Sequence, residues 1–99
     1  MRELLSKLDH INELKAKLLS LEARKSNLIR ELNLNLNENV SLWLEEKSGY
    51  YYIRYRDKND KLRSIYVRKN QLEKARSLIY IIKEIRRIRK KLERIILLL

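Results

Sequence analysis

The chain has 99 residues, of which 37% are charged and 44% hydrophobic, with one glycine and no proline. A chain of this length forms one small domain, and this composition favours long helices with few loops. The absence of cysteine excludes disulfides, thiolate metal sites and cysteine nucleophiles, and it fits a reducing or hot cytoplasm.

The formal net charge is +11, with a pI near 10.1. Residues 1–49 hold eight basic and eight acidic side chains, whereas residues 50–99 hold sixteen and five. This asymmetry predicts an anionic partner, nucleic acid before a membrane surface.

Apolar residues recur at heptad spacing in the first third of the chain. One register contains Leu4, Ile11, Leu18 and Leu32, and the other contains Leu14, Leu21 and Leu28. Lys7 and Lys25 interrupt this seam. With no glycine or proline inside it, the pattern predicts a helix within residues 1–34, about 30 residues and roughly 45 Å long.

After Leu32 the heptad gives way to alternation of apolar and polar residues. Asparagine is unfavourable inside helices, so we expect Asn33–Asn39 to form a helix exit. A small antiparallel β-meander is predicted over residues 40–67. Its expected segments are the strand Val40–Glu46, the turn Lys47–Gly49, and the hairpin strands Tyr50–Arg56 and Leu62–Val67.

The length of the second hairpin loop decides which side chains share a face of the sheet. A three-residue loop, which we favour, separates an apolar set from a polar set, whereas a two-residue loop mixes them. With three residues, one face carries Tyr51, Ile53, Tyr55, Ile65 and Val67, and the other carries Tyr50, Tyr52, Arg54, Arg56, Ser64 and Tyr66.

A second heptad helix is predicted over residues 70–99, where Asn70 and Glu73 form a capping box at its start. Its seam contains Leu78, Ile81, Ile85, Ile88, Leu92, Ile95 and Leu99. Its opposite side carries Lys83, Arg86, Arg87, Lys90, Lys91 and Arg94. We expect an apolar seam along one side of this helix and a basic surface along the opposite side, the basic back.

The predicted fold class is α+β: two long heptad-patterned helices flank a small β-meander, and the helices form a coiled coil or a dimeric helical bundle. The helices pair either antiparallel within one chain or in parallel between chains. Pairing within one chain leaves Leu5, Leu19, Ile29, Ile82 and Ile96 uncovered, which favours a dimer with four helices. In parallel pairing, Leu and Ile at the two seam positions favour more than two strands. Both arrangements therefore predict a homo-oligomer, and we favour a dimer. The expected oligomer interface contains Leu78, Ile81, Ile85, Ile88, Leu92, Ile95, Leu99, Ile11, Leu14, Leu18, Leu21 and Leu28.

The basic back of the second helix and the Arg/Tyr hairpin suit a DNA- or RNA-binding protein that reads phosphates more than bases, with DNA favoured. The expected contact residues are Arg54, Arg56, Arg63, Arg68, Lys69, Lys83, Arg86, Arg87, Lys90, Lys91, Arg94, Tyr50, Tyr52 and Tyr66. The plainer interpretations are a solvated helix face and tyrosines that merely suit strands. The alternative function is a scaffolding coiled coil that binds another protein. A membrane-surface helix is disfavoured because the seam is narrow.

No reaction is indicated by the sequence, and we expect neither an enzyme nor a cofactor or metal. His10 is the sole histidine, and Glu45 and Glu46 are strand neighbours that point to opposite faces. A phosphate-binding glycine loop and metal-ligand spacings are missing from the sequence. With neither a signal peptide nor a membrane-spanning run, we expect a soluble cytoplasmic protein, in the host cytoplasm if viral.

The tyrosine-rich strand, turn and Ser/Arg-Tyr strand of residues 50–67, with the charged helix that follows, resemble an uncharacterised family of small archaeal and mobile-element proteins. This chain has Asn59, Asp60 and Lys61 where glycine is usual, and it lacks the cysteine cluster that often precedes the hairpin. The resemblance implies an archaeal or viral origin and a link to nucleic acid, without the family's metal site.

Overall fold

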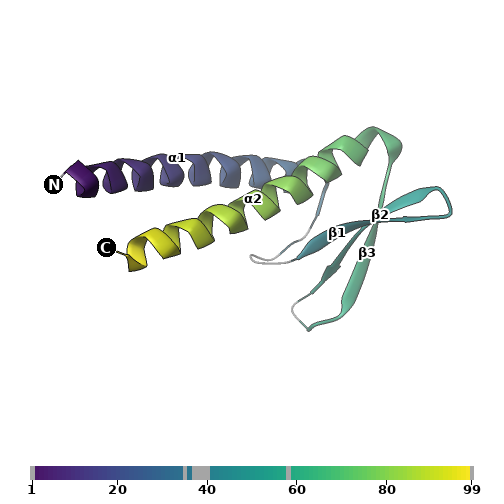
Figure 1. Cartoon of the computed structure of the whole chain (residues 1–99). Helices are drawn as coiled ribbons and strands as arrows, with labels where there is room; N and C mark the ends of the chain where they lie inside the picture. The colour runs from purple at the N-terminus through teal and green to yellow at the C-terminus, as the bar shows by residue number, and fades with distance from the viewer. Residues whose placement is uncertain (1, 35, 37–40, 58, 99) are drawn as a thin grey trace.

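In the computed structural model, two long helices flank a three-stranded antiparallel sheet (Figure 1). The structure describes residues 2–34, 36, 41–57 and 59–98. The predicted α+β class is confirmed. The elements are α1 (Arg2–Glu31), β1 (Leu42–Lys47), β2 (Tyr50–Arg56), β3 (Leu62–Val67), the 3₁₀ turn η1 (Lys69–Gln71) and α2 (Leu72–Leu97). The molecule is elongated, with extents of 58 × 29 × 21 Å.

Helices α1 and α2 run antiparallel, and both chain termini lie at the end away from the sheet (Figure 1). The structure therefore has the intrachain pairing of the two alternatives. The predicted seam residues of both helices, expected at an oligomer interface, have their contacts inside one chain. The buried members of this helix-pair core are Ile11, Leu14, Leu21, Ile81, Ile85, Ile88 and Leu92, with Leu18, Leu28 and Ile95 partly buried beside them. Leu99 lies outside the described residues.

The sheet covers the other end of α2 and forms a second core with it. Leu78, which has no exposed surface, packs here rather than against the middle of α1. This core consists of Leu32, Leu34, Leu42, Ile53, Val67, Ala75, Leu78 and Ile82. The expectation that Ile82 and Ile29 stay uncovered is wrong, because the sheet folds over that flank of the helices. Leu5, Leu19 and Ile96 are exposed, as expected for a single helix pair.

Strand order in the sheet is β1-β2-β3, and the register confirms the favoured hairpin faces. Ile53 lies opposite Ile65, and Tyr52 lies opposite Tyr66. Directly opposed residues project to the same face, so the apolar and polar sets separate as predicted. The apolar face packs on α2, and the polar face is left without a covering element among the described residues.

The two turns of the sheet use left-handed backbone at positions that the loop lengths require. Ser48 and Gly49 have φ of 56° and 81°, as a two-residue type I′ turn needs. The turn thus begins one residue later than predicted, because Lys47 still pairs with Tyr50. In the second turn, Asp57 N–H donates to the Lys61 carbonyl at 2.9 Å, which closes the predicted three-residue loop.

Helix α1 ends at Glu31 and is followed by a left-handed Asn33, where the helix exit was predicted to begin. Residues 35 and 37–40, which belong to the predicted exit and to the start of the predicted strand, lie outside the described residues. The Leu34 N–H donates to the Ile29 carbonyl and the Asn33 N–H to the Arg30 carbonyl, both at 3.0 Å. This pair of hydrogen bonds is a Schellman motif, in which asparagine replaces the usual glycine. The motif turns Leu34 into the sheet core, where Ile29 also packs.

The predicted capping box at the start of α2 is wrong. The helix begins at Leu72, and Gln71 at the N-cap makes no side-chain capping hydrogen bond. Asn70 instead lies inside η1, where the Gln71 N–H donates to the Arg68 carbonyl at 2.9 Å. The chain must turn tightly after the buried end of β3 to bring α2 onto the sheet, and the 3₁₀ turn makes that change of direction.

Truncation of the α2 seam should destabilise the protein strongly. Ile81 is fully buried between the helices, so Ile81→Ala should lower the free energy of unfolding by about 2–5 kcal/mol through lost burial and a cavity. Leu19→Ala is the matched control, because Leu19 is 69% exposed and its truncation should change stability by less than about 0.5 kcal/mol. Urea unfolding followed by helical circular dichroism measures both. Equal losses would contradict the packing described.

Candidate nucleic-acid interface

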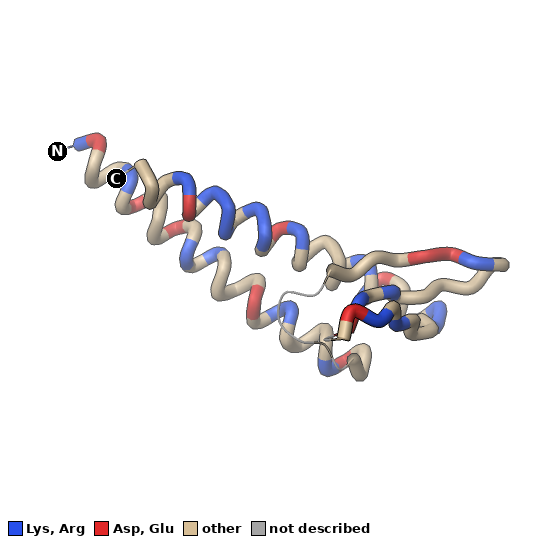
Figure 2. The backbone as a smooth tube through the Cα atoms, turned by 90° about the horizontal axis from the view of Figure 1, so that it is seen from below, with Lys and Arg blue, Asp and Glu red and all other residues tan. Residues whose placement is uncertain are grey.

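Positive charge gathers on α2, which contains nine basic and three acidic residues. Figure 2 shows Lys and Arg following one another along this helix, whereas α1 alternates basic and acidic residues. The apolar ridge of α2 is buried against α1 and the sheet. The basic residues predicted on its back are all exposed: Lys83, Arg86, Arg87, Lys90, Lys91 and Arg94. We call these six residues the basic face.

Most of the basic face has no carboxylate beside it. Among the described residues, no ion pair within 4.0 Å joins a carboxylate to Lys83, Lys90, Lys91 or Arg94. Arg87 pairs with Glu84 at 2.8 Å. That hydrogen bond holds the pKa of the Glu84 carboxyl below its ordinary value and raises the pKa of Arg87. The charge of the basic face is therefore largely available to an external anion.

Arg86 connects the basic face to the edge of the sheet. Its guanidinium donates a hydrogen bond to the Ser41 hydroxyl at 3.0 Å. Ser41 immediately precedes β1, whose first residue, Leu42, lies opposite Tyr55. Arg56 follows Tyr55 on β2, so the cations of α2 reach the end of the sheet where β2 finishes.

The uncovered face of the sheet, here called the open face, is rich in aromatic side chains. The strand registers place Tyr52 between Glu45 and Tyr66, and Arg54 between Trp43 and Ser64. The Tyr66 ring lies 6.0 Å from the Tyr50 ring and 5.9 Å from the Tyr52 ring, measured between centroids. The open face comprises Trp43, Glu45, Lys47, Tyr50, Tyr52, Arg54, Arg56, Leu62, Ser64 and Tyr66.

The arginines of the hairpin are paired with carboxylates, unlike most of the basic face. Arg54 binds Glu45 at 2.5 Å, and its Nε is buried without a partner in the described part of the chain. The Arg56 guanidinium lies 3.8 Å from the Asp60 carboxylate and donates to the Asp60 carbonyl at 3.1 Å. These contacts restrain both side chains in the sheet.

Arg63 does not join the tyrosines of the open face as expected. It lies opposite Tyr55, hence on the covered side of the sheet, and pairs with Asp57 at 2.8 Å. Arg68 and Lys69 are exposed beyond the end of β3. The structure thus brings together Tyr50, Tyr52, Tyr66, Arg54 and Arg56, and separates Arg63 from them.

Sequence reasoning missed Trp43, which is 39% exposed on the open face. A signal for it was present, because Trp43 falls between Leu42 and Leu44 in the alternating segment and so belongs to the side opposite these leucines. Its neighbour across the sheet, Arg54, was among the predicted contact residues.

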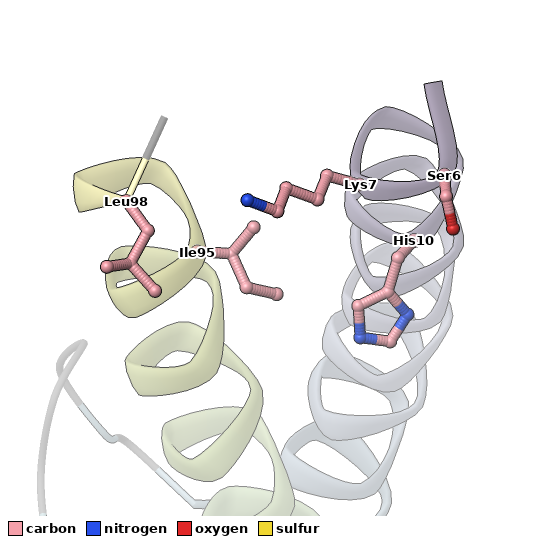
Figure 3. A pocket seen from close by; sticks show the side chains of 5 residues that line it. All are labelled: Ser6, Lys7, His10, Ile95 and Leu98. Carbon is pink, nitrogen blue, oxygen red and sulfur yellow. The ribbon is translucent and has the colours of Figure 1, made fainter. Parts of the chain in front are cut away.

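A shallow pocket lies between the free ends of the helices, with a volume of about 220 Å³. Figure 3 shows Lys7 reaching from α1 toward Ile95 and Leu98, with Ser6 and His10 on the same helix as Lys7. The described residues contain no group of three or more His, Asp or Glu side chains able to hold a metal ion. Neither described helix combines the length and apolarity that crossing a bilayer requires.

No protein-family model, curated protein or solved structure matches this chain. The resemblance of residues 50–67 to small archaeal and mobile-element proteins stays a prediction.

The Asp57 carboxylate organises the second hairpin turn. It accepts hydrogen bonds from the Asn59 N–H, the Lys61 N–H and the Arg63 Nε at 2.9, 3.0 and 2.8 Å. The Arg63 hydrogen bond, with those of the backbone, holds the pKa of Asp57 below its ordinary value. A lowered pKa in the folded state stabilises the protein above the unfolded-state pKa, and this contribution is lost as the pH falls through the folded-state value.

Asp57→Asn should therefore lower the melting temperature at neutral pH, with a difference from wild type that narrows as the pH falls below about 4. Thermal unfolding by circular dichroism between neutral and acidic pH measures the effect. Asp9→Asn, at an exposed position on α1 with no ion pair to a described residue, is the matched control. A difference that widens toward acidic pH would contradict this role of the ionised carboxylate.

Proposed function

We propose that this chain is a small basic homo-oligomeric protein that binds nucleic acid, with its α2 helix contacting phosphates and the Arg/Tyr hairpin adding contacts from the sheet. The observation that carries the proposal is the row of exposed cations on α2, four of which have no ion pair to a described carboxylate: Lys83, Lys90, Lys91 and Arg94. Their opposite side is buried, so the helix is held in place while its charge faces outward.

The spacing of these cations supports a polyanion rather than a single small anion. Residues three or four apart on a helix lie about 5–6 Å from each other, which is less than the Debye length of about 8 Å at physiological salt. The fields of Arg86, Lys90 and Arg94, each four residues from the next, therefore add. A solvated face usually mixes signs, whereas α2 has nine basic residues against three acidic ones. Nucleic acid is a ligand with charge repeated at comparable intervals.

We favour DNA over RNA as the ligand. We propose that the protein acts in the cytoplasm, or in the host cytoplasm if it is viral. Binding by phosphate contacts is sequence-independent and sensitive to salt. The uncovered tyrosines of the hairpin add a surface on which bases or sugars can pack. DNA and RNA oligonucleotides of one sequence, titrated in parallel, test the choice between the two polymers.

We further propose that two copies associate through the helix ends distant from the sheet. The seam is already occupied within the chain, yet large apolar side chains of both helices stay exposed there. They are Leu4, Leu5, Leu8, Ile96, Leu97 and Leu98, between 43% and 85% exposed. Apolar groups gathered from two helices at one end form a patch that favours association, and a second copy offers the same patch in a two-fold arrangement.

Charge reversal on the basic face should lower the affinity for nucleic acid and make that affinity less dependent on salt concentration. Each lysine that contacts a phosphate contributes about 0.9 to the slope of log K against log salt, so Lys90→Glu with Lys91→Glu should reduce the slope by about two. Affinity at low salt should fall at least tenfold. Fluorescence anisotropy of labelled single-stranded and duplex oligonucleotides at several salt concentrations measures both quantities.

The matched control reverses Lys15 and Arg24, two exposed residues of α1, and changes the net charge by the same amount. This control should retain more affinity than the Lys90/Lys91 variant. An equal loss in both would show that net charge alone matters. If the wild-type chain binds no oligonucleotide at low salt, the proposal fails, and the alternative of a protein-binding scaffold takes its place.

Association should depend on the exposed apolar ends of the helices. The wild-type chain should scatter light as a dimer at micromolar concentration, and Leu5→Asp with Leu97→Asp should give a monomer of unchanged helix content, because both side chains are exposed in one chain. Leu19→Asp, exposed nearer the middle of α1, is the control and should remain dimeric. A wild-type monomer would contradict the dimer.

A further inference from the structure

The tyrosines of the sheet divide into two groups with different surroundings. Tyr51 and Tyr55 pack against the core beneath the sheet. Tyr50 and Tyr66, on the open face, are 56% and 51% exposed, and neither belongs to a core cluster. The outer face of an antiparallel sheet is usually polar, and here it also carries four aromatic side chains, Trp43, Tyr50, Tyr52 and Tyr66, that belong to neither core.

We propose that the open face binds the unpaired bases of a single-stranded nucleic acid by stacking, while the basic face holds the phosphates of the same strand. This inference rests on the function proposed above and names its substrate class. Tyrosine and tryptophan rings stack on bases of any sequence, because every base has a π-face. The Tyr50, Tyr52 and Tyr66 rings already lie edge to face or tilted against one another as a continuous patch.

The dimensions of the sheet favour a single strand over the groove of a duplex. Neighbouring strands lie about 4.8 Å apart, so the backbones of β1 and β3 are separated by roughly 10 Å before side chains are added. The major groove of B-DNA is about 12 Å wide and admits a two-stranded ribbon. The three-strand open face, with Trp43 and Tyr66 on its outer strands, is too broad to enter it flat.

The open face and the basic face meet, so that one strand can contact both. Arg56 lies at the end of the open face nearest Ser41, and the Ser41 hydroxyl accepts the hydrogen bond from Arg86. From Arg86, Lys90 and Arg94 follow at intervals of four residues, or about 6 Å along the helix axis. A strand stacked on the tyrosines and leaving past Arg56 would therefore run along cations of α2.

This division of roles agrees with the ion pairs. The open-face arginines, Arg54 and Arg56, are restrained by Glu45 and Asp60, whereas Lys90 and Arg94 have no ion pair to a described carboxylate. Stacking then supplies the attraction on the sheet, and Coulombic attraction supplies it on the helix. A duplex, whose bases are already stacked in pairs, would engage only the second surface.

Trp43 is the only tryptophan of the chain and lies on the open face, so its fluorescence reports directly on this surface. The test titrates the full chain with an oligothymidylate of about 15 residues, near the upper end of single-strand site sizes, and with a duplex of equal length. The single strand should change Trp43 emission at saturation, and the duplex should bind without a comparable change.

Tyr66→Ala should weaken single-strand binding about five- to hundredfold, the range found for one stacked base, and leave duplex binding within about twofold. Tyr66→Phe keeps the ring and should keep the affinity. Leu19→Ala is the control, because Leu19 is 69% exposed on α1 and belongs to neither the open face nor the basic face. Tyr50→Ala, at the end of the sheet, repeats the measurement should Tyr66→Ala not fold.

Two results overturn this inference while the proposed function stands. In the first, both oligonucleotides bind with strong salt dependence and Trp43 emission stays unchanged. In the second, the tyrosine variants lose no more single-strand than duplex affinity. By contrast, absence of binding to either oligonucleotide at low salt would overturn the proposed function as well.

Discussion

Burial of the α2 ridge is the constraint from which the rest of the structure follows. Leu78 and Ile81, one helical turn apart, have no exposed surface, yet the first belongs to the sheet core and the second to the helix-pair core. One helix therefore holds together the sheet and α1. The apolar side of α2 packs against both the sheet and α1. This packing holds the helix in place although the like charges on its other side repel each other. The display of charge depends on that packing.

The arginines and lysines in the described part of the chain fall into two groups that composition does not distinguish: those paired with a nearby carboxylate and those without such a partner. In the meander, Glu45, Asp57 and Asp60 each face an arginine, so these pairs hold the strands and turn in register. On α2, Arg87 pairs with Glu84, and two further cations pair with carboxylates of α1, whereas four others have no ion pair to a described carboxylate: Lys83, Lys90, Lys91 and Arg94. The net charge of +11 is thus unevenly available, and the helix rather than the hairpin carries most of what a phosphate backbone would meet.

Periodicity allowed both long helices, the three strands and the hairpin faces to be predicted, because heptads and alternation report directly on which side of an element is buried. The Asn33 exit was likewise local. The features that escaped prediction depend on contacts distant in sequence. The sheet covers Ile82, a 3₁₀ turn displaces the capping box at Asn70, and Asp57 draws Arg63 away from the tyrosines. Trp43 was overlooked, although its position between two apolar leucines in the alternating segment indicated the face opposite to theirs.

The charge of Lys7 at a seam position sets a boundary on the helix pair. The last fully buried layer contains Ile11 and Leu92, and beyond it Lys7 extends toward Ile95 and Leu98 (Figure 3). Burying an ammonium group among apolar side chains without a counter-charge is costly, so the packed core between the helices ends at Lys7. The two helices are consequently joined least tightly at the chain ends, where the shallow pocket lies, whereas the layers nearer the sheet are held by the buried residues of both cores.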